Sequence, residues 1–155
     1  MLCIWWNSKG VLFYEILKPG ETVTANLYKG QLQKLNEKIQ VLRPHNAHTP
    51  RKVLLLHDNA RPHIAIATKD AISELGWEPL PHPAYSPDLG PSNYHLFRSL
   101  QHSMSQQSFK NDEEVRKSID FFISSKEESF FCKGIHKLRE KWAKVINSNG
   151  DYFED

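Results

Sequence analysis

The sequence predicts an α/β protein in which a mixed β-sheet carries helices on its faces. Strand-like and helix-like segments alternate along the first half of the chain. Residues 53–56 (VLLL) form a short, unbroken apolar run of the kind buried in a parallel sheet. The composition, 39% hydrophobic and 11% aromatic over 155 residues, is sufficient for a core. We expect one domain over residues 1–155.

The first two segments predict a β-hairpin. Residues 2–6 (LCIWW) and 11–17 (VLFYEIL) are rich in β-branched and aromatic residues, and residues 7–10 (NSKG) between them have a turn composition. The first strand begins almost at Met1, so we expect that an upstream segment is missing.

A helix is expected next, after Pro19 and Gly20 end the second strand and residues 21–24 offer N-cap candidates. Its buried face is predicted from apolar residues at steps of three and four: Tyr28, Leu32, Leu35, Ile39 and Leu42. Its other face carries basic residues: Lys29, Lys34, Lys38 and Arg43. A solvated face is the expectation for these, and contact with nucleic-acid phosphates is the open alternative.

Asp58 follows the apolar run of residues 53–56, which is preceded by a predicted loop at residues 44–50. We expect this run to be a strand buried on both faces. Asp58 would then lie at its carboxyl end, where open α/β sheets place their chemistry. The segments that follow predict a helix over residues 64–75 ended by Gly76, an edge strand over residues 77–80, and a stiff Pro-rich loop.

Three helices are predicted in the remaining sequence. Asn93 lies in the first turn of one whose apolar face includes Leu96 and Leu100, so we expect Asn93 to point inward, toward the sheet and Asp58. Asn111 and Glu114 predict a capping box at the start of the next. The last helix has an apolar stripe consisting of Phe131, Ile135, Leu138, Trp142 and Val145. The tail from residue 147 is expected to fray. This order of elements fits the later part of a ribonuclease H-like fold.

Several side chains near Asp58 allow more than one interpretation. A lone Asp58 could be a turn or N-cap residue rather than a metal ligand, and Asp88 suits a turn or helix entry. His57 and His63 are too few for a zinc site, so local hydrogen bonding is expected. Arg61 could contact phosphate or form a structural ion pair.

Composition also limits the class of protein. The net charge of +2 and the pI near 8.5 permit nucleic-acid binding without arguing for it. Cys3 and Cys132 are far apart, which favours free thiols and a reducing compartment. The sequence contains neither an apolar run of about 20 residues nor a signal-peptide pattern, so we expect an intracellular protein without a membrane segment.

Three motifs carry a family resemblance. Residues 57–63 (HDNARPH), 80–89 (LPHPAYSPDL) and 91–97 (PSNYHLF) resemble the catalytic domain of mariner-family transposases, as do the hairpin and the residues around Trp142 and Gly150. The resemblance extends over nearly the whole chain. The chain also resembles the transposase part of SETMAR-type methyltransferase fusions. The resemblance implies a ribonuclease H-like, DDE-type catalytic domain.

The resemblance also implies the site residues. The family uses three metal-binding aspartates with 34 residues between the second and the third, and 34 residues separate Asp58 from Asn93 here. Asp58 therefore matches the second aspartate, and Asn93 replaces the third. The family's first aspartate lies on a central strand upstream of the hairpin, and neither that strand nor the amino-terminal helix-turn-helix region is expected in this chain. Two Mg²⁺ or Mn²⁺ ions are the implied cofactors, held more weakly because an amide is neutral.

Two functions are therefore expected. The first is a partial transposase catalytic domain, nuclear and DNA-binding, which is inactive or impaired in metal-dependent strand cleavage and transfer. The second is a domesticated, non-enzymatic DNA- or protein-interaction module of SETMAR-like type. The implied partners are DNA and a possible second copy of the chain, with no small-molecule cofactor. Arg61 and His63 are the candidate DNA contacts beside the catalytic and metal-binding positions Asp58 and Asn93.

Overall fold

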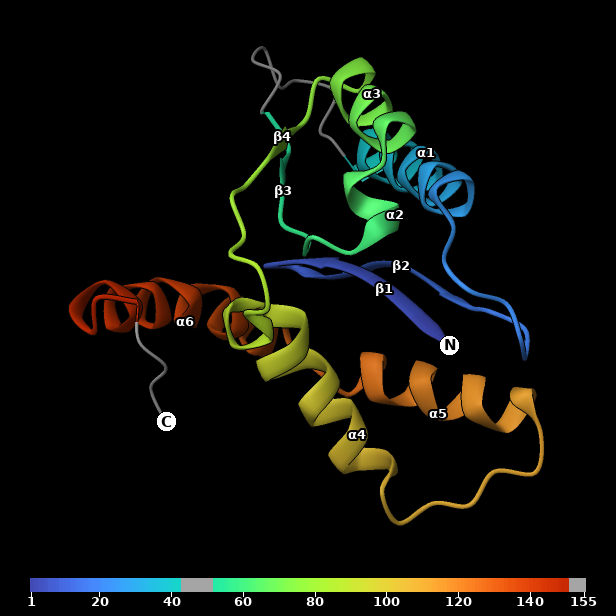
Figure 1. Ribbon diagram of the computed structural model, residues 1–155. Coiled ribbons are helices and arrows are strands. Elements are labelled where there is room, and N and C mark those ends of the chain that lie inside the picture. The colour runs from blue at the N-terminus through green and yellow to red at the C-terminus, as the bar shows by residue number, and fades with distance from the viewer. Residues whose placement is uncertain (43–51, 151–155) are drawn as a thin grey trace. The chain divides into compact units, whose positions relative to one another are not determined.

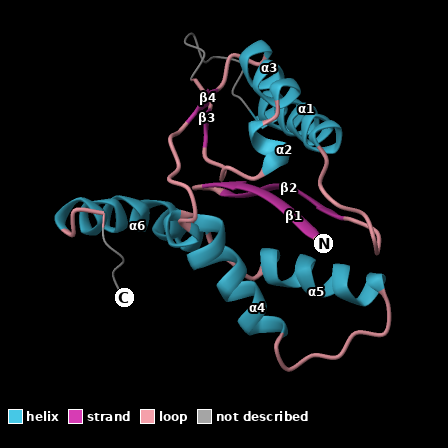
Figure 2. Ribbon diagram, in the orientation of Figure 1, coloured by secondary structure: helices cyan, strands magenta, loops and turns pink. Residues whose placement is uncertain are grey.

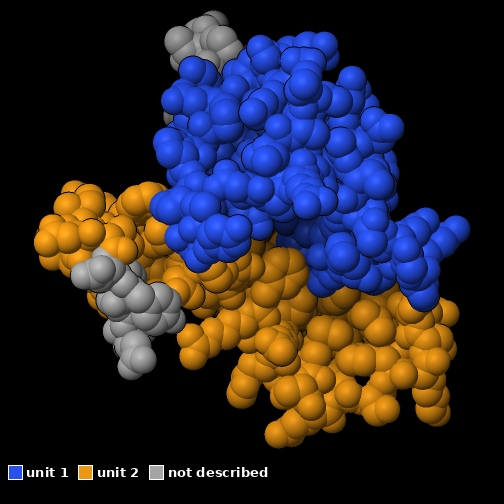
Figure 3. All heavy atoms as spheres, in the orientation of Figure 1, with its two compact units in different colours: residues 1–5, 12–86 blue, residues 6–11, 87–155 orange. Residues whose placement is uncertain are grey.

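The structure, a computed structural model, describes residues 1–42 and 52–150. The loop predicted over residues 44–50, Arg43 and the last five residues of the tail lie outside the described residues. The chain divides into two compact units, shown in Figure 3: unit 1 contains residues 1–5 and 12–86, and unit 2 contains residues 6–11 and 87–155. Within the described residues, every helix is too short or too polar to cross a membrane.

The predicted hairpin is confirmed. Strands β1 (Leu2–Asn7) and β2 (Gly10–Ile16) pair with each other in a two-stranded sheet, drawn as the long magenta arrows in Figure 2. The Asn7 carboxamide oxygen accepts a hydrogen bond from the Lys9 backbone N–H at 2.8 Å, which stabilises the turn between the strands. The hairpin tip, residues 6–11, belongs to unit 2, and the rest of the hairpin belongs to unit 1.

Helix α1 (Ala25–Leu42) supplies three of the six buried residues of the unit 1 core cluster. Thr24 caps it, because its Oγ1 accepts a hydrogen bond from the Leu27 N–H at 3.1 Å. The predicted apolar face packs against α3 (Ile66–Glu74), and the two helices lie together in Figure 1. Leu42 departs from the prediction and is 67% exposed, since it is the last residue of the helix. The buried core cluster comprises Tyr28, Leu32, Leu35, Leu55, Ile72 and Trp77.

Strand β3 (Leu54–Leu55) pairs in parallel with β4 (Glu78–Pro79), and Leu54 is in register with Glu78. The predicted strand and edge strand are therefore confirmed. The expectation of burial on both faces is wrong for Leu54, which is 59% exposed, because only the Leu55 side of β3 faces the core that α1 and α3 supply. In the described part of the chain, the hairpin and the β3–β4 pair are two separate sheets.

The helix expected over residues 64–75 is interrupted. Helix α2 (Arg61–Ile64) ends before Ala65, whose φ of −59° and ψ of 146° are extended, and α3 begins at Ile66. The Thr68 hydroxyl donates to the Pro62 carbonyl at 2.6 Å across this break. Gly76 ends α3 as predicted, with a φ of 67° that favours glycine.

Unit 2 is helical. A 3₁₀ turn, η1 (Pro87–Leu89), and a π-helical segment, η2 (Ser92–Phe97), lead into α4 (Arg98–Met104), α5 (Asp112–Ser124) and α6 (Glu128–Asn147). The predicted start of α5 is confirmed, since the Asn111 side chain accepts from the Glu114 N–H at 3.0 Å, while the Glu114 carboxylate accepts from the Lys110 N–H at 2.8 Å in place of the reciprocal bond of a full capping box. The buried apolar residues of this unit are Leu89, Leu96, Leu100, Ile119, Phe122 and Phe131.

Candidate metal-binding site

Asp58 lies just beyond the carboxyl end of β3, as the sequence predicts. Its Oδ1 accepts hydrogen bonds from the Ala60 backbone N–H at 2.9 Å and from Nδ1 of His63 at 2.6 Å. Its side chain is nevertheless 57% exposed, so the carboxylate is accessible from solvent. The turn at residues 58–60 and the short helix α2, which carries His63, together fix the orientation of this carboxylate.

The surroundings of Asp58 favour its ionised form. Partial burial opposes ionisation, but the Ala60 N–H and the nearby His63 hold the pKa of the Asp58 carboxyl below its ordinary value. An ionised, accessible carboxylate is the type of ligand that Mg²⁺ and Mn²⁺ prefer. Asp58 thus suits a hard divalent cation as one ligand.

A cluster of three rings, Tyr28, His57 and His63, lies beside Asp58 and was not predicted from the sequence. The Tyr28 hydroxyl lies 2.8 Å from Nδ1 of His57. The rings of His57 and His63 stack with centroids 5.1 Å apart, and the Tyr28 ring lies 4.3 Å from that of His63. Burial, together with His63, lowers the pKa of His57 to about 4, so His57 is neutral near pH 7. The sequence feature that could have predicted this cluster is Tyr28 on the apolar face of α1, because a buried tyrosine hydroxyl usually has a hydrogen-bond partner.

Asn93 lies at the start of η2 in unit 2, and its side chain is exposed. Its Nδ2 donates to the Pro87 carbonyl at 3.3 Å. The expectation that Asn93 shares the buried face of Leu96 and Leu100 is wrong, since Asn93 is exposed and the segment is π-helical, which changes the angle between successive side chains. The amide oxygen is a neutral ligand type for a hard cation.

The residues on either side of Asn93 anchor its segment to other parts of unit 2. The Trp6 indole N–H donates to the Ser92 hydroxyl at 3.0 Å. The Tyr94 hydroxyl donates to the Gly134 carbonyl at 2.6 Å, and burial raises the pKa of Tyr94 to about 12. These anchors were not predicted, because they join positions up to 86 residues apart in the sequence.

His95 makes a further anchor on α6. Its Nε2 is 2.8 Å from the Phe130 carbonyl oxygen, and its ring packs on Gly134. A Cβ atom at position 134 would lie 2.7 Å from His95 Cγ, so glycine is required there for this packing. The position of Asn93 in its unit is therefore set by contacts of its neighbours with α6.

The other candidates occupy distinct environments. Arg61 is exposed at the start of α2 and makes no ion pair with any residue in the described ranges, so the alternative of a structural ion pair is not observed. His63 is engaged with Asp58 and is mostly buried, with a side chain 20% exposed. Asp88 lies in the 3₁₀ turn η1, in agreement with the predicted turn role.

Asp58 belongs to unit 1 and Asn93 to unit 2. Among residues 1–42 and 52–150 there is no group of three or more His, Cys, Asp or Glu side chains placed to hold a metal ion. Asp58 and Asn93 both offer the oxygen atoms that a hard divalent cation prefers, but only Asp58 carries a negative charge.

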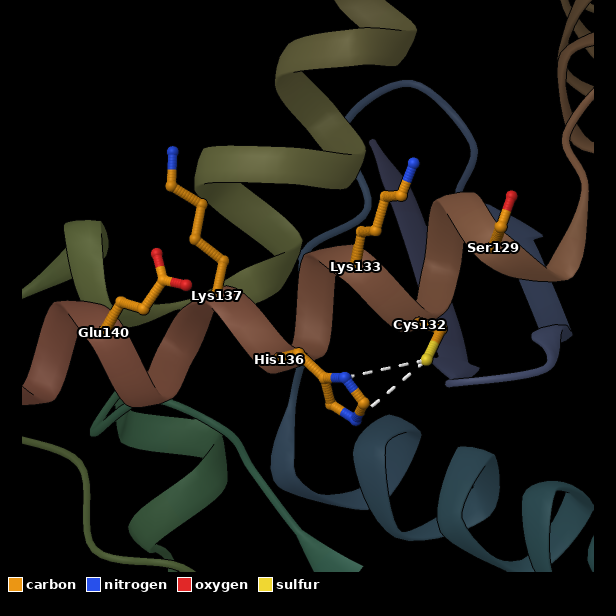
Figure 4. A pocket seen from close by; sticks show the side chains of 6 residues that line it. All are labelled: Ser129, Cys132, Lys133, His136, Lys137 and Glu140. Carbon is orange, nitrogen blue, oxygen red and sulfur yellow. Dashed lines mark hydrogen bonds between the residues drawn. The ribbon is translucent and has the colours of Figure 1, made fainter.

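A separate hollow follows the surface of α6 and contains neither Asp58 nor Asn93. In Figure 4, Cys132 and His136 point toward each other on this helix, with the sulfur 3.8 Å from Nδ1. Lys133 and Lys137 extend from the same helix. A thiol and one imidazole are fewer ligands than a structural zinc site uses, so this hollow is not a metal site by its own residues.

Comparison with known proteins identifies the family. A model of transposases, described as a partial DDE domain, matches residues 1–49. The mariner Mos1 transposase of Drosophila mauritiana is 47% identical over 154 residues, which is 99% of this chain and 45% of that protein. The crystal structure of the Mos1 catalytic domain matches with a TM-score of 0.94 and 49% identity, and the match covers 99% of this chain and 75% of that one. This chain belongs to the mariner transposase family, within its catalytic domain.

The mariner assignment confirms the expected ribonuclease H-like α/β fold class. The human histone-lysine N-methyltransferase SETMAR is also similar, 41% identical over 155 residues, which is 99% of this chain and 22% of that protein. The chain thus spans less than half the length of these curated mariner relatives. Solved structures of the Mos1 catalytic domain contain raltegravir with Mg or with Mn, and Mos1 has also been solved as a paired-end complex with the left transposon end.

Proposed function

We propose that this chain is a mariner-type catalytic domain that binds DNA and in which metal-dependent strand cleavage and transfer are impaired. The observation that carries the proposal is the ionised, accessible Asp58 at the end of β3, with a neutral Asn93 at the position of the family's last metal-binding aspartate. Asp58 and Asn93 would be the metal ligands, and His63 would hold the Asp58 carboxylate in place.

The replacement of a carboxylate by an amide explains the impairment. Two divalent cations activate the attacking oxygen and stabilise the leaving oxygen in phosphodiester chemistry when both are bound. Asn93 can contribute an oxygen but no charge, and Asp58 supplies one negative charge. Metal affinity depends on the number of charged ligands, so it falls when one is lost.

The proposed partner is DNA, and the proposed compartment is the nucleus. The exposed guanidinium of Arg61, three residues after Asp58, is placed to contact a phosphate near the site. The Mos1 structures with transposon ends support DNA as the partner, and the paired-end complexes support a second copy of the chain as another.

A non-enzymatic interaction module of SETMAR-like type is the second candidate. The 41% identity to SETMAR favours it. The two candidates differ in one property. An impaired enzyme has a metal site that depends on Asp58, whereas a pure interaction module does not.

Titration with Mn²⁺, followed by calorimetry and by electron paramagnetic resonance of the free ion, tests the proposal. We expect the unchanged chain to bind Mn²⁺ weakly, Asp58→Ala to lose that binding, and Asn93→Asp to tighten it by about tenfold, because a second carboxylate is restored. Asp88→Asn is the matched control, since Asp88 is an exposed carboxylate in the neighbouring 3₁₀ turn and no proposed ligand.

A plasmid-nicking assay on the same proteins, with folding checked by circular dichroism, completes the test. Cleavage by a folded Asn93→Asp protein, without cleavage by the unchanged chain, would identify the asparagine as the cause of the impairment. If neither Asp58→Ala nor Asn93→Asp changes Mn²⁺ binding, the metal site is refuted and the interaction module takes its place.

A further inference from the structure

Tyr85 is an aromatic residue in an unusual position. It lies in the Pro-rich loop between β4 and η1, and its relative exposure of 103% means that nothing in the described structure covers its ring. Its φ of 54° is in the left-handed region, which side chains other than glycine and asparagine rarely adopt. A large apolar ring is thus held in solvent on a strained backbone, and strain of this kind is concentrated at functional sites.

The loop around Tyr85 maintains this conformation. Pro81, Pro83 and Pro87 fix three φ angles on either side of it. The Ser86 hydroxyl donates to the Ala84 carbonyl at 3.0 Å, which closes the turn over Tyr85. The ring is therefore presented by a stiff loop, so little conformational entropy is lost when a ligand contacts it.

The same loop is joined to the candidate metal site within unit 1. Asn59, the residue after Asp58, donates from its Nδ2 to the His82 carbonyl at 2.8 Å. His82 also lies close enough to influence the pKa values of Asp58 and His57. Tyr85 follows His82 by three residues, and Arg61 follows Asp58 by three. The exposed ring of Tyr85 thus lies on the loop that Asn59 bonds, and the exposed Arg61 lies three residues after Asp58.

We infer that Tyr85 is a stacking platform for an unpaired base of the DNA strand that passes Asp58. The inference rests on the proposed function, because it takes DNA as the partner. A base exposes a π-face of about the size of a phenol ring, and base–aromatic stacking requires only one accessible ring and no surrounding pocket. Arg61 would hold a phosphate of the same strand.

The immediate neighbours of Tyr85 favour a base over a protein surface. Protein contacts centre on anchor residues surrounded by other packed side chains. Ala84 and Ser86 are small, and the nearest larger apolar neighbours in the sequence are Pro83 and Pro87, each two residues away. A single isolated ring provides the contact area of one base. A second copy of the chain seated on Tyr85 is the competing outcome of the experiment.

Two substitutions separate the ring from the backbone conformation. Tyr85→Phe keeps the stacking surface, and Tyr85→Asn removes it while keeping a residue that tolerates a positive φ. Each protein is titrated, in EDTA, with a fully paired duplex and with the same duplex carrying a short single-stranded tail that contains 2-aminopurine. Fluorescence anisotropy gives the affinity, and quenching of 2-aminopurine reports stacking directly.

We expect Tyr85→Asn to weaken binding of the tailed DNA by about 5- to 150-fold and to abolish the quenching. Binding of the paired duplex should be unchanged, and Tyr85→Phe should match the unchanged chain on both DNAs. Equal affinity of Tyr85→Asn and the unchanged chain for the tailed DNA would overturn the inference and leave DNA binding intact. If the unchanged chain binds neither DNA, the proposed DNA partner fails, and the stacking role fails with it.

Sedimentation equilibrium on the same variants tests the competing occupant. A shift of the monomer–dimer equilibrium in Tyr85→Asn, with DNA binding unaffected, would place Tyr85 in a contact between copies and would overturn the stacking role. Phe121→Ala is the matched control for loss of an exposed aromatic ring, because Phe121 is 75% exposed on α5.

Discussion

His63 Nδ1 lies 2.6 Å from Asp58 Oδ1, and this contact joins the short helix α2 to the carboxylate at the end of β3. It gives Asp58 a fixed orientation while its side chain stays more than half exposed. The two histidines on either side of Asp58 in the sequence have different partners, since His57 bonds Tyr28 and His63 bonds Asp58.

The first prediction concerns this contact and pH. Because the pKa of Asp58 is lowered in the folded state, the unfolded state binds more protons at this group. The stabilisation is therefore fully present above the unfolded pKa of about 3.9, and it is lost as pH falls through the folded pKa.

His63→Ala removes one cause of the lowered pKa, so the Asp58 pKa should rise toward its ordinary value. A carbon-13 NMR titration of the Asp58 carboxyl measures this. His136→Ala, a substitution on α6, should leave the titration unchanged, and an unchanged Asp58 pKa in His63→Ala would contradict the prediction.

The second prediction concerns the packing of His95 on Gly134. Gly134→Ala should lower the free energy of unfolding by about 1–3 kcal/mol, because the new Cβ would overlap the His95 ring. Urea denaturation measures the loss. Gly30→Ala in α1 is the matched control: no atom lies within 4 Å of its new Cβ, so the same substitution should stabilise the protein there by about 0.5–1 kcal/mol.

A double-mutant cycle sharpens this test. In a His95→Ala background the ring is gone, so adding Gly134→Ala should cost little further stability. A Gly134→Ala cost of similar size in both backgrounds would show that the loss does not arise from the His95 ring.

The third prediction concerns Glu15, which joins β2 to α1. Buried Gln31 donates from Nε2 to Glu15 Oε2 at 3.0 Å, and Lys34 Nζ lies 3.2 Å from Oε1. The hydrogen bond from Gln31 holds the pKa of Glu15 below its ordinary value, despite the opposing effect of burial, and Lys34 lowers it further. Stability from this group is thus present above the unfolded pKa of about 4.3 and is lost as pH falls through the folded pKa.

Glu15→Gln should therefore be less stable than the unchanged chain at pH 7, with a smaller difference at pH 3. Urea midpoints at the two pH values measure the change. Glu37→Gln is the control for removal of a carboxylate from an exposed position on α1. A Glu15→Gln difference that grows on acidification would refute the assignment.

The fourth prediction concerns the strain at Tyr85. Tyr85→Asn should raise the free energy of unfolding by up to about 1 kcal/mol, because asparagine adopts a positive φ at lower cost than tyrosine. Tyr85→Phe keeps the strain and should leave stability unchanged. Chemical denaturation of the three proteins decides the matter. A destabilised Tyr85→Asn would mean that the ring makes a stabilising contact.

The local elements were predictable because their signals lie within a few residues. The turn at residues 7–10, the face of α1 through Tyr28 and Leu32, and the Asn111 cap of α5 all depend on neighbours in the sequence. The placement of Asp58 after β3 was predictable for the same reason, since a short apolar run ends just before it. The spacing from Asp58 to Asn93 was readable without any structure.

The exposure of Leu54, the break at Ala65 and the π-helical turn at Asn93 were not predictable from periodicity. Each depends on what packs nearby. Leu54 is exposed because the core contacts only the Leu55 side of β3. The segment carrying Asn93 is held by the bond from Tyr94 to Gly134 and by the packing of His95, both on α6.

The sequence alone therefore determined the family, the α/β class and the identities of the two candidate ligands, because motifs and spacing are properties of the chain itself. Tertiary structure decided how each candidate ligand is presented: Asp58 hydrogen-bonded to His63 with its pKa lowered, Asn93 exposed, and Tyr85 exposed on a stiff loop. The physical reason is that orientation, burial and pKa depend on atoms brought together by folding, and no local pattern specifies those atoms.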